Sequence, residues 1–304
     1  MEAVIAEHIS KKYRNQEVLS GIELNIKQGE MFGIIGPDGA GKTTLFRILT
    51  TLILPDTGQV FVSGLHAESQ YLEIRKRIGY MPGRFSLYLD MTVEENLEFF
   101  AKVFHTSVQE NDYLIRDIYV QLEPFKKRKA GDLSGGMKQK LALCCALIHR
   151  PEVLFLDEPT TGVDPISRKE FWRMLGRLKE SGMTIVVSTP YMDEAAQCDR
   201  IALIKSGRFL IQDTPKNIVS TFPYDLLAVE GNHPFQLLKD LRKHPLVVHC
   251  YAFGDAHHTT IQQDSMTEST LTTYLEQLGH TGVFIQKIEP SIEDCFMQLA
   301  MNHE

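Results

Sequence analysis

The segment GPDGAGKTT, residues Gly36 to Thr44, is the most informative part of this sequence for its fold. It fits the phosphate-binding P-loop pattern G-x-x-x-x-G-K-[ST]. A continuous apolar run from Met31 to Ile35 precedes it, and helical spacing begins at Thr43 and continues to Leu54. This order of strand, glycine-rich loop and helix lets backbone N–H groups and the helix N-terminus point at phosphate oxygens. The sequence therefore predicts a nucleotide-phosphate site in which Lys42 reaches the β and γ phosphates and Thr43 ligates Mg²⁺.

A second segment, LFLDE from Leu154 to Glu158, is an apolar strand that ends in two carboxylates. Acidic residues often follow a strand simply because a loop begins there. In a P-loop protein, however, Asp157 at the strand end is placed to hold the Mg²⁺ shell, and Glu158 can activate water for attack on the γ-phosphate. We favour this second interpretation.

A third segment, LSGGMKQ, begins at Leu133 and heads a helix that runs through Leu147. Ser134, Gly135 and Gly136 at a helix start are consistent with nothing more than an N-cap and a turn. The same geometry also exposes N–H groups and a hydroxyl toward an anion. The pattern alone leaves both interpretations open.

Short apolar runs predict the strands of a buried parallel sheet. They are Val153 to Leu156, Thr184 to Ser188 and Ile201 to Ile204, and a helical segment separates the first two. Residues 92–150 are expected to be mostly helical, with apolar positions three and four apart in Val93 to Phe104 and in Leu114 to Leu122. Near the N-terminus, Ala3 to His8 and Ile22 to Ile26 alternate as short strands, with a break expected at Gly21.

Residues 215–223 contain prolines, Thr and Ser that interrupt this pattern, so a domain boundary is expected there. The remainder predicts a small α+β domain close to a β-α-β-β-α-β layout. Its strands are expected at 226–230, 247–253, 257–262 and 283–288, and its helices at 235–243, 268–278 and 291–300.

The composition limits the class of protein. The chain has 304 residues, 43% hydrophobic and 23% charged, as in ordinary globular domains, which excludes a disordered or fibrous chain. Its net charge of −7 disfavours nucleic acid or an anionic membrane as the main partner. No run approaches the roughly 18 apolar residues of a membrane span. Five cysteines without a C-x-x-C pair indicate neither a zinc cluster nor a disulfide framework.

With the P-loop, LSGGMKQ, LFLDEP and the segment Thr161-Gly162-Val163-Asp164 in this order, the chain resembles the ATP-binding subunit of an ABC transporter. The resemblance covers residues 1 to about 220. It implies an α/β P-loop NTPase fold of the ABC ATPase type, with a central mostly parallel sheet, an antiparallel β subdomain and a helical subdomain at about 84–150. Residues 221–304 would form the small C-terminal α+β accessory domain.

The resemblance also assigns site residues for ATP and Mg²⁺. Tyr13 would stack on adenine. The phosphates would be bound by Gly36, Pro37, Asp38, Gly39, Ala40, Gly41, Lys42, Thr43 and Thr44. Asp157 would position Mg²⁺ together with Thr43, and Glu158 would polarise the attacking water. Ser134, Gly135 and Gly136 would contact the γ-phosphate held by a second ATP-binding domain, because these domains dimerise head to tail around two ATP molecules.

Within the family, the P-loop string, LSGGMKQK and the ending Glu289 to Phe296 look like the ABC-2 type exporters. A separate integral membrane permease is therefore the expected partner, and the region from Arg84 to Phe104 would form the groove for its coupling helix. An amphipathic core helix would show the same spacing. The resemblance implies a peripheral location on the cytoplasmic face of the inner membrane for a chain that is soluble when isolated.

Two positions depart from the family pattern. The family usually has Gln after a Gly-Tyr-x-Pro run, whereas Gly83 follows Pro82 here; members commonly read Ser-Thr-His where this chain has Ser188-Thr189-Pro190. Neither glycine nor proline has a polar side chain to replace the lost contact. One interpretation is tolerated variation in an active ATPase. We favour a degenerate site that binds Mg-ATP but hydrolyses it slowly, in a chain paired with an unlike ATPase.

Two other functions fit parts of the pattern. One is a soluble ABC ATPase acting on nucleic acid or ribosomes, although such proteins tend to carry two nucleotide domains or long coiled-coil insertions. The other is a regulatory nucleotide sensor without a motor role. Co-purification with a permease, or with RNA or DNA, would discriminate between the first of these and a transporter subunit.

Overall fold

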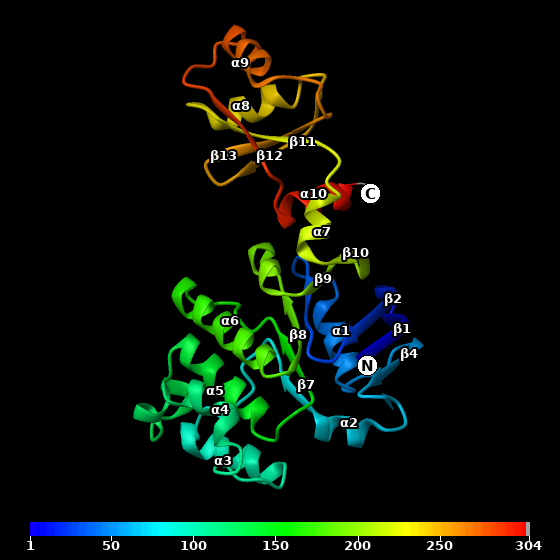
Figure 1. The fold of residues 1–304 in the computed structure, drawn as a ribbon, viewed down its shortest axis with the longest axis vertical. Coiled ribbons are helices and arrows are strands. Elements are labelled where there is room, and N and C mark those ends of the chain that lie inside the picture. The colour runs from blue at the N-terminus through cyan, green and yellow to red at the C-terminus, as the bar shows by residue number, and fades with distance from the viewer. Residues whose placement is uncertain (302–304) are drawn as a thin grey trace. The chain divides into compact units, whose positions relative to one another are not determined.

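The computed structural model describes residues 1–301, and the chain divides into two compact units, Met1–Pro215 and Lys216–Glu304 (Figure 1). No helix in residues 1–301 is both long and apolar enough to span a bilayer.

A six-stranded sheet organises the first unit, in the order β10-β9-β3-β8-β7-β6. Its strands, in chain order, are β3 Met31–Ile35, β6 Ile78–Met81, β7 Val153–Asp157, β8 Thr184–Thr189, β9 Arg200–Lys205 and β10 Arg208–Asp213. All neighbours are parallel except β9 and β10. The carboxyl ends of β3, β6, β7 and β8 therefore meet at one edge, where ligands of open α/β sheets bind.

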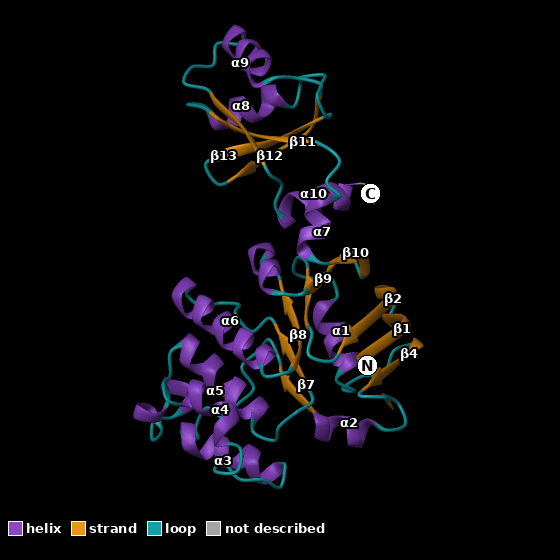
Figure 2. Ribbon diagram, viewed as in Figure 1, coloured by secondary structure: helices purple, strands orange, loops and turns teal. Residues whose placement is uncertain are grey.

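Helices cover both faces of this sheet, which explains why every residue of β3, β7 and β8 is buried. On one face, Phe32, Ile34 and Phe155 pack with Leu45 and Phe46 of α1, Lys42–Leu49. Helices α5, Gly135–Leu147, and α6, Pro165–Glu180, lie on the opposite side of the sheet from α1 (Figure 2).

A second, antiparallel sheet packs on the other side of α1, in the order β2-β1-β4-β5. Its strands are β1 Glu2–Tyr13, β2 Gln16–Lys27, β4 Thr57–Val62 and β5 Leu65–His66. The expected break at Gly21 is wrong, because the hairpin turn falls at 14–15 and both strands continue through bulges. His8 and Gly21 have φ of 52° and 61°, and the register shifts between Ala6 and Ile9.

The helical part of this unit contains α3, Val93–Val103, and α4, Asp112–Tyr119, together with α5. Short 3₁₀ turns occur at Glu123–Phe125, Ala130–Asp132 and Met192–Gln197, and α2, Tyr71–Arg77, precedes β6. The expectation that the helix after the P-loop reaches Leu54 is wrong. Helix α1 ends at Leu49 because Thr51 takes a left-handed backbone, with φ of 62°.

The second unit has a four-stranded antiparallel sheet in the order β12-β13-β11-β14. In chain order its elements are β11 Asp225–Glu230, α8 Pro234–Leu241, β12 Val247–Phe253, β13 Ala256–Ile261, α9 Glu268–Gln277, β14 Phe284–Ile288 and α10 Ile292–Met301, after α7 Pro215–Ser220. Leu227 and Val229 pack against α8 and α9 on one face. The β-α-β-β-α-β layout predicted from the sequence is present, and the predicted fold class is confirmed.

Candidate nucleotide site

The loop between β3 and α1 is shaped by glycines that no other residue could replace. A Cβ on Gly36 would lie 2.2 Å from the carbonyl oxygen of Ile204. Gly41 has φ of 105°, and a Cβ there would lie 2.8 Å from the Val18 carbonyl oxygen. Gly36 N–H donates to the Thr189 carbonyl at 3.2 Å, which ties the loop to the end of β8. The sequence thus places a tight, glycine-dependent turn directly before a helix N-terminus.

Lys42 is the first residue of α1, and its side chain is only 2% exposed. Its Nζ donates to the carbonyl oxygens of Gly36 at 2.8 Å and Pro37 at 3.0 Å. The same Nζ lies 3.0 Å from Glu158 Oε1. The ammonium group is therefore held over the loop, where a bound phosphate would lie, and is within reach of the candidate base.

Asp157 ends β7 and is 1% exposed. It accepts a hydrogen bond from Ser188 Oγ at 2.7 Å and one from the Thr43 hydroxyl. Burial raises the pKa of this carboxyl above its ordinary value, although the hydrogen bonds from Ser188 and Thr43 act in the opposite direction. A carboxylate beside a hydroxyl is an oxygen donor set that suits Mg²⁺, which takes few protein ligands and keeps several waters.

Glu158 follows with a strained backbone, φ of 51°, in the region that L-residues rarely adopt. Its N–H donates to the Ser188 carbonyl at 3.1 Å and to Ser188 Oγ at 3.0 Å. Strain of this kind persists only where the surroundings fix it, and it concentrates at functional sites. Beside Lys42, this carboxylate can orient a water toward a phosphate held by the loop.

The two departures from the family pattern lie at the same edge of the sheet. Gly83 comes two residues after β6, and a Cβ on it would lie 3.0 Å from the Asp157 carbonyl oxygen. Pro190 directly follows Thr189 at the end of β8. The structure thus places Gly83 against Asp157 and Pro190 directly after Thr189, whose carbonyl binds Gly36 of the P-loop, and neither position offers a polar side chain.

Ser134 lies elsewhere, as the N-cap of α5. Its Oγ accepts a hydrogen bond from Met137 N–H at 3.3 Å. A Cβ on Gly136 would lie 2.8 Å from Ser167 Oγ, and one on Gly135 would lie 3.7 Å from the Gly162 carbonyl oxygen. This turn therefore adjoins the 162–167 segment instead of the P-loop, and its first N–H groups head a separate helix.

Tyr13 is the last residue of β1, and 43% of its surface is exposed. The hairpin turn to β2 follows it directly. The ring is therefore accessible to a stacking ligand at the surface of the antiparallel sheet.

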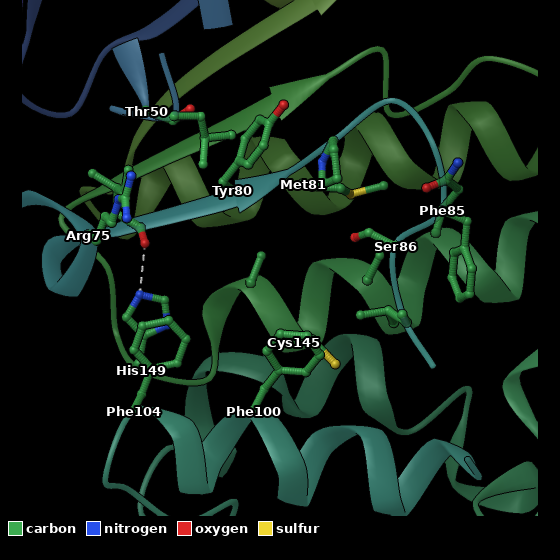
Figure 3. A pocket seen from close by; sticks show the side chains of 17 residues that line it. Thr50, Arg75, Tyr80, Met81, Phe85, Ser86, Phe100, Phe104, Cys145 and His149 are labelled. Carbon is green, nitrogen blue, oxygen red and sulfur yellow. Dashed lines mark hydrogen bonds between the residues drawn. The ribbon is translucent and has the colours of Figure 1, made fainter. Parts of the chain in front are cut away.

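A groove of about 260 Å³ lies next to the site, between β6 and the helical part. Figure 3 shows its aromatic lining, which includes Tyr80, Phe85, Phe100 and Phe104. The sequence did not reveal two polar residues here, Arg75 from α2 and His149 after α5. Burial lowers the pKa of His149, which stacks on Phe104 at 3.7 Å between ring centroids and hydrogen-bonds to the Ile78 carbonyl at 2.9 Å. The groove is apolar, with Arg75 as its charged lining side chain.

A glycine-rich loop between a strand and a helix, together with an Asp at the end of β7, which is separated from β3 by β8 in the parallel part of the sheet, defines a P-loop NTPase. Residues 19–161 match the ABC transporter family. The chain is 37% identical over 297 residues to the Nod factor export ATP-binding protein I of Burkholderia thailandensis, covering 96% of this chain and 95% of that protein. It is 40% identical over 220 residues to the probable multidrug ABC transporter ATP-binding protein YbhF of Escherichia coli. That match covers 71% of this chain and only 38% of YbhF.

Solved structures agree with these relatives. A dimeric post-hydrolysis state of the ATP-binding cassette MJ0796, bound to ADP and Pi, gives a TM-score of 0.63 at 28% identity, covering 69% of this chain and 98% of that chain. The cbiO1 protein of Clostridium perfringens, part of the ABC transporter complex cbiONQ, gives 0.65 at 27% identity, covering 72% and 91%. The chain belongs to the ABC transporter family, as an ATP-binding protein with the ATPase activity of that family.

Proposed function

We propose that this chain is the ATP-binding subunit of an ABC-2 type exporter, and that its own P-loop site hydrolyses ATP slowly. The matches to a Nod factor export protein over 96% of the chain and to a probable multidrug ABC transporter protein over 71% of it support the exporter class. Residues 1–220 would form the ATP-binding domain, and residues 221–304 an accessory domain.

In this proposal, residues 36–44 bind the ATP phosphates and Tyr13 stacks on adenine. Thr43 and Asp157 hold Mg²⁺, which would neutralise phosphate charge, and Glu158 orients the attacking water. Lys42 supports this assignment, because its buried Nζ is held over the loop by the Gly36 carbonyl and Glu158, where a phosphate could take their place. ATP binding would transfer Lys42 from the loop carbonyls and Glu158 to the phosphates.

One observation carries the slow-site proposal: Gly83, packed against the Asp157 carbonyl, and Pro190, directly after β8, stand where family members have a glutamine and a histidine. Losing one side chain that is already positioned to stabilise the charge of the transition state lowers the hydrolysis rate by about 10²- to 10³-fold. Two losses would leave little turnover even with Glu158 in place. Ser134, Gly135 and Gly136 are present, so this chain can complete the site of an unlike, fully equipped ATPase.

The apolar groove supports a membrane permease as the other partner. Aromatic side chains line it, and one of its lining residues, Leu52, is an exposed apolar side chain. A helix with an apolar face fits such a groove, and a carboxylate on that helix could pair with Arg75. Docking there would hold the subunit at the cytoplasmic face of the membrane.

The test compares the two ATPase sites in the reconstituted complex. Glu158→Gln in this chain is made alongside the equivalent change in the partner ATPase, and phosphate release is measured for each. We expect Glu158→Gln to lower turnover by less than about twofold, because this site contributes little. The partner change should abolish turnover.

Loss of turnover on Glu158→Gln with only a mild effect of the partner change would contradict the slow-site proposal. A purified complex made of two copies of this chain would contradict the unlike partner. Binding of ATP to this chain, measured separately by equilibrium titration, distinguishes a slow site from a site that binds no nucleotide.

A further inference from the structure

A buried carboxylate outside the P-loop site, Glu194, links the segments that follow β7 and β8. It lies in the 3₁₀ turn Met192–Gln197 and is 3% exposed. A carboxylate that has lost its water must find donors inside the protein. Two threonine hydroxyls donate to it, one from the segment after β7 and one from the end of β8.

The first donor is Thr160, which is 1% exposed and donates from Oγ1 to Glu194 Oε1 at 2.9 Å. The second is Thr189, fully buried at the end of β8, whose hydroxyl donates to Glu194 Oε2. Arg168 of α6 lies 3.7 Å away, between Nε and Oε1, and stacks over the Tyr191 ring at 4.6 Å. Each carboxylate oxygen therefore has its own hydroxyl partner.

Only one residue separates Thr160 from Glu158, the candidate base. The position of Thr160 therefore restricts where the Glu158 carboxylate can lie. The strained backbone of Glu158 is held on one side by Ser188, which accepts its N–H. On the other side, the Glu158 carbonyl accepts the N–H of Thr161 at 3.2 Å, and the Thr160 hydroxyl donates to Glu194, which is the bond that ties this segment to the one after β8. Backbone strain persists only where such contacts fix it.

Thr189 connects the same carboxylate to the phosphate loop. Its carbonyl accepts the N–H of Gly36 at 3.2 Å, while its hydroxyl donates to Glu194. Three loops, after β3, β7 and β8, are thus joined through one side chain. Pro190, the next residue, has no polar side chain to provide another link.

We propose that Glu194 is a positioning residue for ATP hydrolysis, which fixes Glu158 relative to the P-loop through Thr160 and Thr189. Its buried carboxylate is bonded to the Thr160 and Thr189 hydroxyls, so it would act on hydrolysis through these two residues. A misplacement of the base by about 1 Å can lower a rate by as much as about 10²-fold, so loss of this link should lower kcat without changing ATP affinity. The proposal concerns the ATPase activity of the family and does not depend on how fast this site is.

The experiment uses the full chain with ATP labelled in the γ-phosphate. The quantity compared is the Glu158-dependent phosphate release, obtained by subtracting the release of the same variant carrying Glu158→Gln. Glu194→Gln, Thr160→Val and their combination are made in the wild-type chain. They are also made in a chain carrying Gly83→Gln and Pro190→His. This chain is expected to hydrolyse ATP faster, so the effect of each substitution is measured against two different starting rates.

We expect Glu194→Gln and Thr160→Val each to lower kcat at least tenfold in both chains, with KM for ATP within about twofold of its starting value. The combined variant should be no slower than the slower single variant, because the contribution of Thr160 runs entirely through Glu194. Thr160→Ser, which keeps the hydroxyl, should recover most of the turnover lost in Thr160→Val. Glu180→Gln, an exposed charge removal at the end of α6, is the matched control.

Several results would overturn the proposal. They are an unchanged kcat, effects of the two substitutions that multiply, failure of Thr160→Ser to recover turnover, and the absence of any Glu158-dependent release in both chains. A fall in melting temperature without a change in kcat per folded molecule would show that Glu194 stabilises the fold only.

Discussion

Single residues at this site are fixed by how little room their neighbours leave. Gly36 contacts the Ile204 carbonyl so closely that a methyl group cannot fit. Lys42 has its aliphatic stem buried and its ammonium over the loop. The sequence pattern was enough to predict a glycine-rich turn that carries Lys42, but not the approach of Gly36 to Ile204 in β9, which is distant in the sequence.

Gly36→Ala should destabilise the first unit by about 2 kcal/mol or more, because its Cβ would lie 2.2 Å from the Ile204 oxygen and backbone must move. The measurement is urea unfolding followed by the fluorescence of Trp172, the single tryptophan of the chain. Gly176→Ala on α6 is the matched control, since nothing lies within 4 Å of its added methyl, and it should raise stability by about 0.5–1 kcal/mol. Equal effects of the two changes would contradict the packing argument.

Glu158, Thr160 and Glu194 mark what the sequence could not show. The role of Glu158 follows from its place after an apolar strand, but its left-handed backbone depends on contacts with Ser188, 30 residues away. The pairing of Thr160 with Glu194 joins residues 34 positions apart. No periodicity encodes such a contact.

Helices and strands were predicted correctly where local sequence determines them, and incorrectly where contacts distant in the sequence do. The strands β3, β7 and β8 are continuous apolar runs, and the structure places them within one residue of the expected bounds. Errors occurred where the backbone leaves the ordinary regions, at the bulges near His8 and Gly21 and at Thr51 after α1. Strand β6 has only four residues and was not predicted. So short a segment shows no clear strand pattern in the sequence, and it is defined as a strand by its pairing with β7.

Helix α10 is attached to the sheet of the second unit through one buried carboxylate. Asp294 accepts hydrogen bonds from His258 Nδ1 at 2.6 Å, from the Tyr251 hydroxyl, and from Ser291 N–H at 2.7 Å. Burial alone would raise the pKa of Asp294, but these hydrogen bonds, together with that of the Ser291 hydroxyl, outweigh burial and lower the pKa to about 2. The segment Ser291 to Phe296 thus provides an anchor for the C-terminal helix.

A lowered pKa predicts how the second unit responds to acid. The stabilisation from ionised Asp294 is fully present above the ordinary pKa of about 4 and is lost as pH falls toward 2. Asp294→Asn should lower the free energy of unfolding of this unit by about 2 kcal/mol at pH 6 and flatten its dependence between pH 4 and 2. Far-ultraviolet circular dichroism during urea unfolding measures this, and Trp172 reports the first unit separately.

Asp255→Asn is the control, because Asp255 is exposed in the turn between β12 and β13. It should leave both the stability and its pH dependence unchanged. An Asp294→Asn chain with the wild-type acid response would show that this carboxylate does not anchor α10.

At the scale of the whole molecule, the chain combines a complete phosphate loop with a sheet edge that lacks two polar side chains. Family membership follows from the order of motifs, which is why the sequence sufficed for it. The consequence of Gly83 and Pro190 is different, because it depends on where the folded sheet places them, Gly83 against Asp157 and Pro190 at the end of β8. In our proposal, the lack of a polar side chain at both positions makes this subunit the slower ATPase of an unlike pair.

The most direct test is to restore both contacts and measure hydrolysis at this P-loop. We predict that Gly83→Gln with Pro190→His raises single-turnover phosphate release by the full chain at least tenfold, and that Glu158→Gln in the same chain removes the gain. Gly83→Ala with Pro190→Ala controls for the crowding near the Asp157 carbonyl and should give no gain. Unchanged release in the restored chain, or a wild-type chain already releasing phosphate at the restored rate through Glu158, would contradict the account.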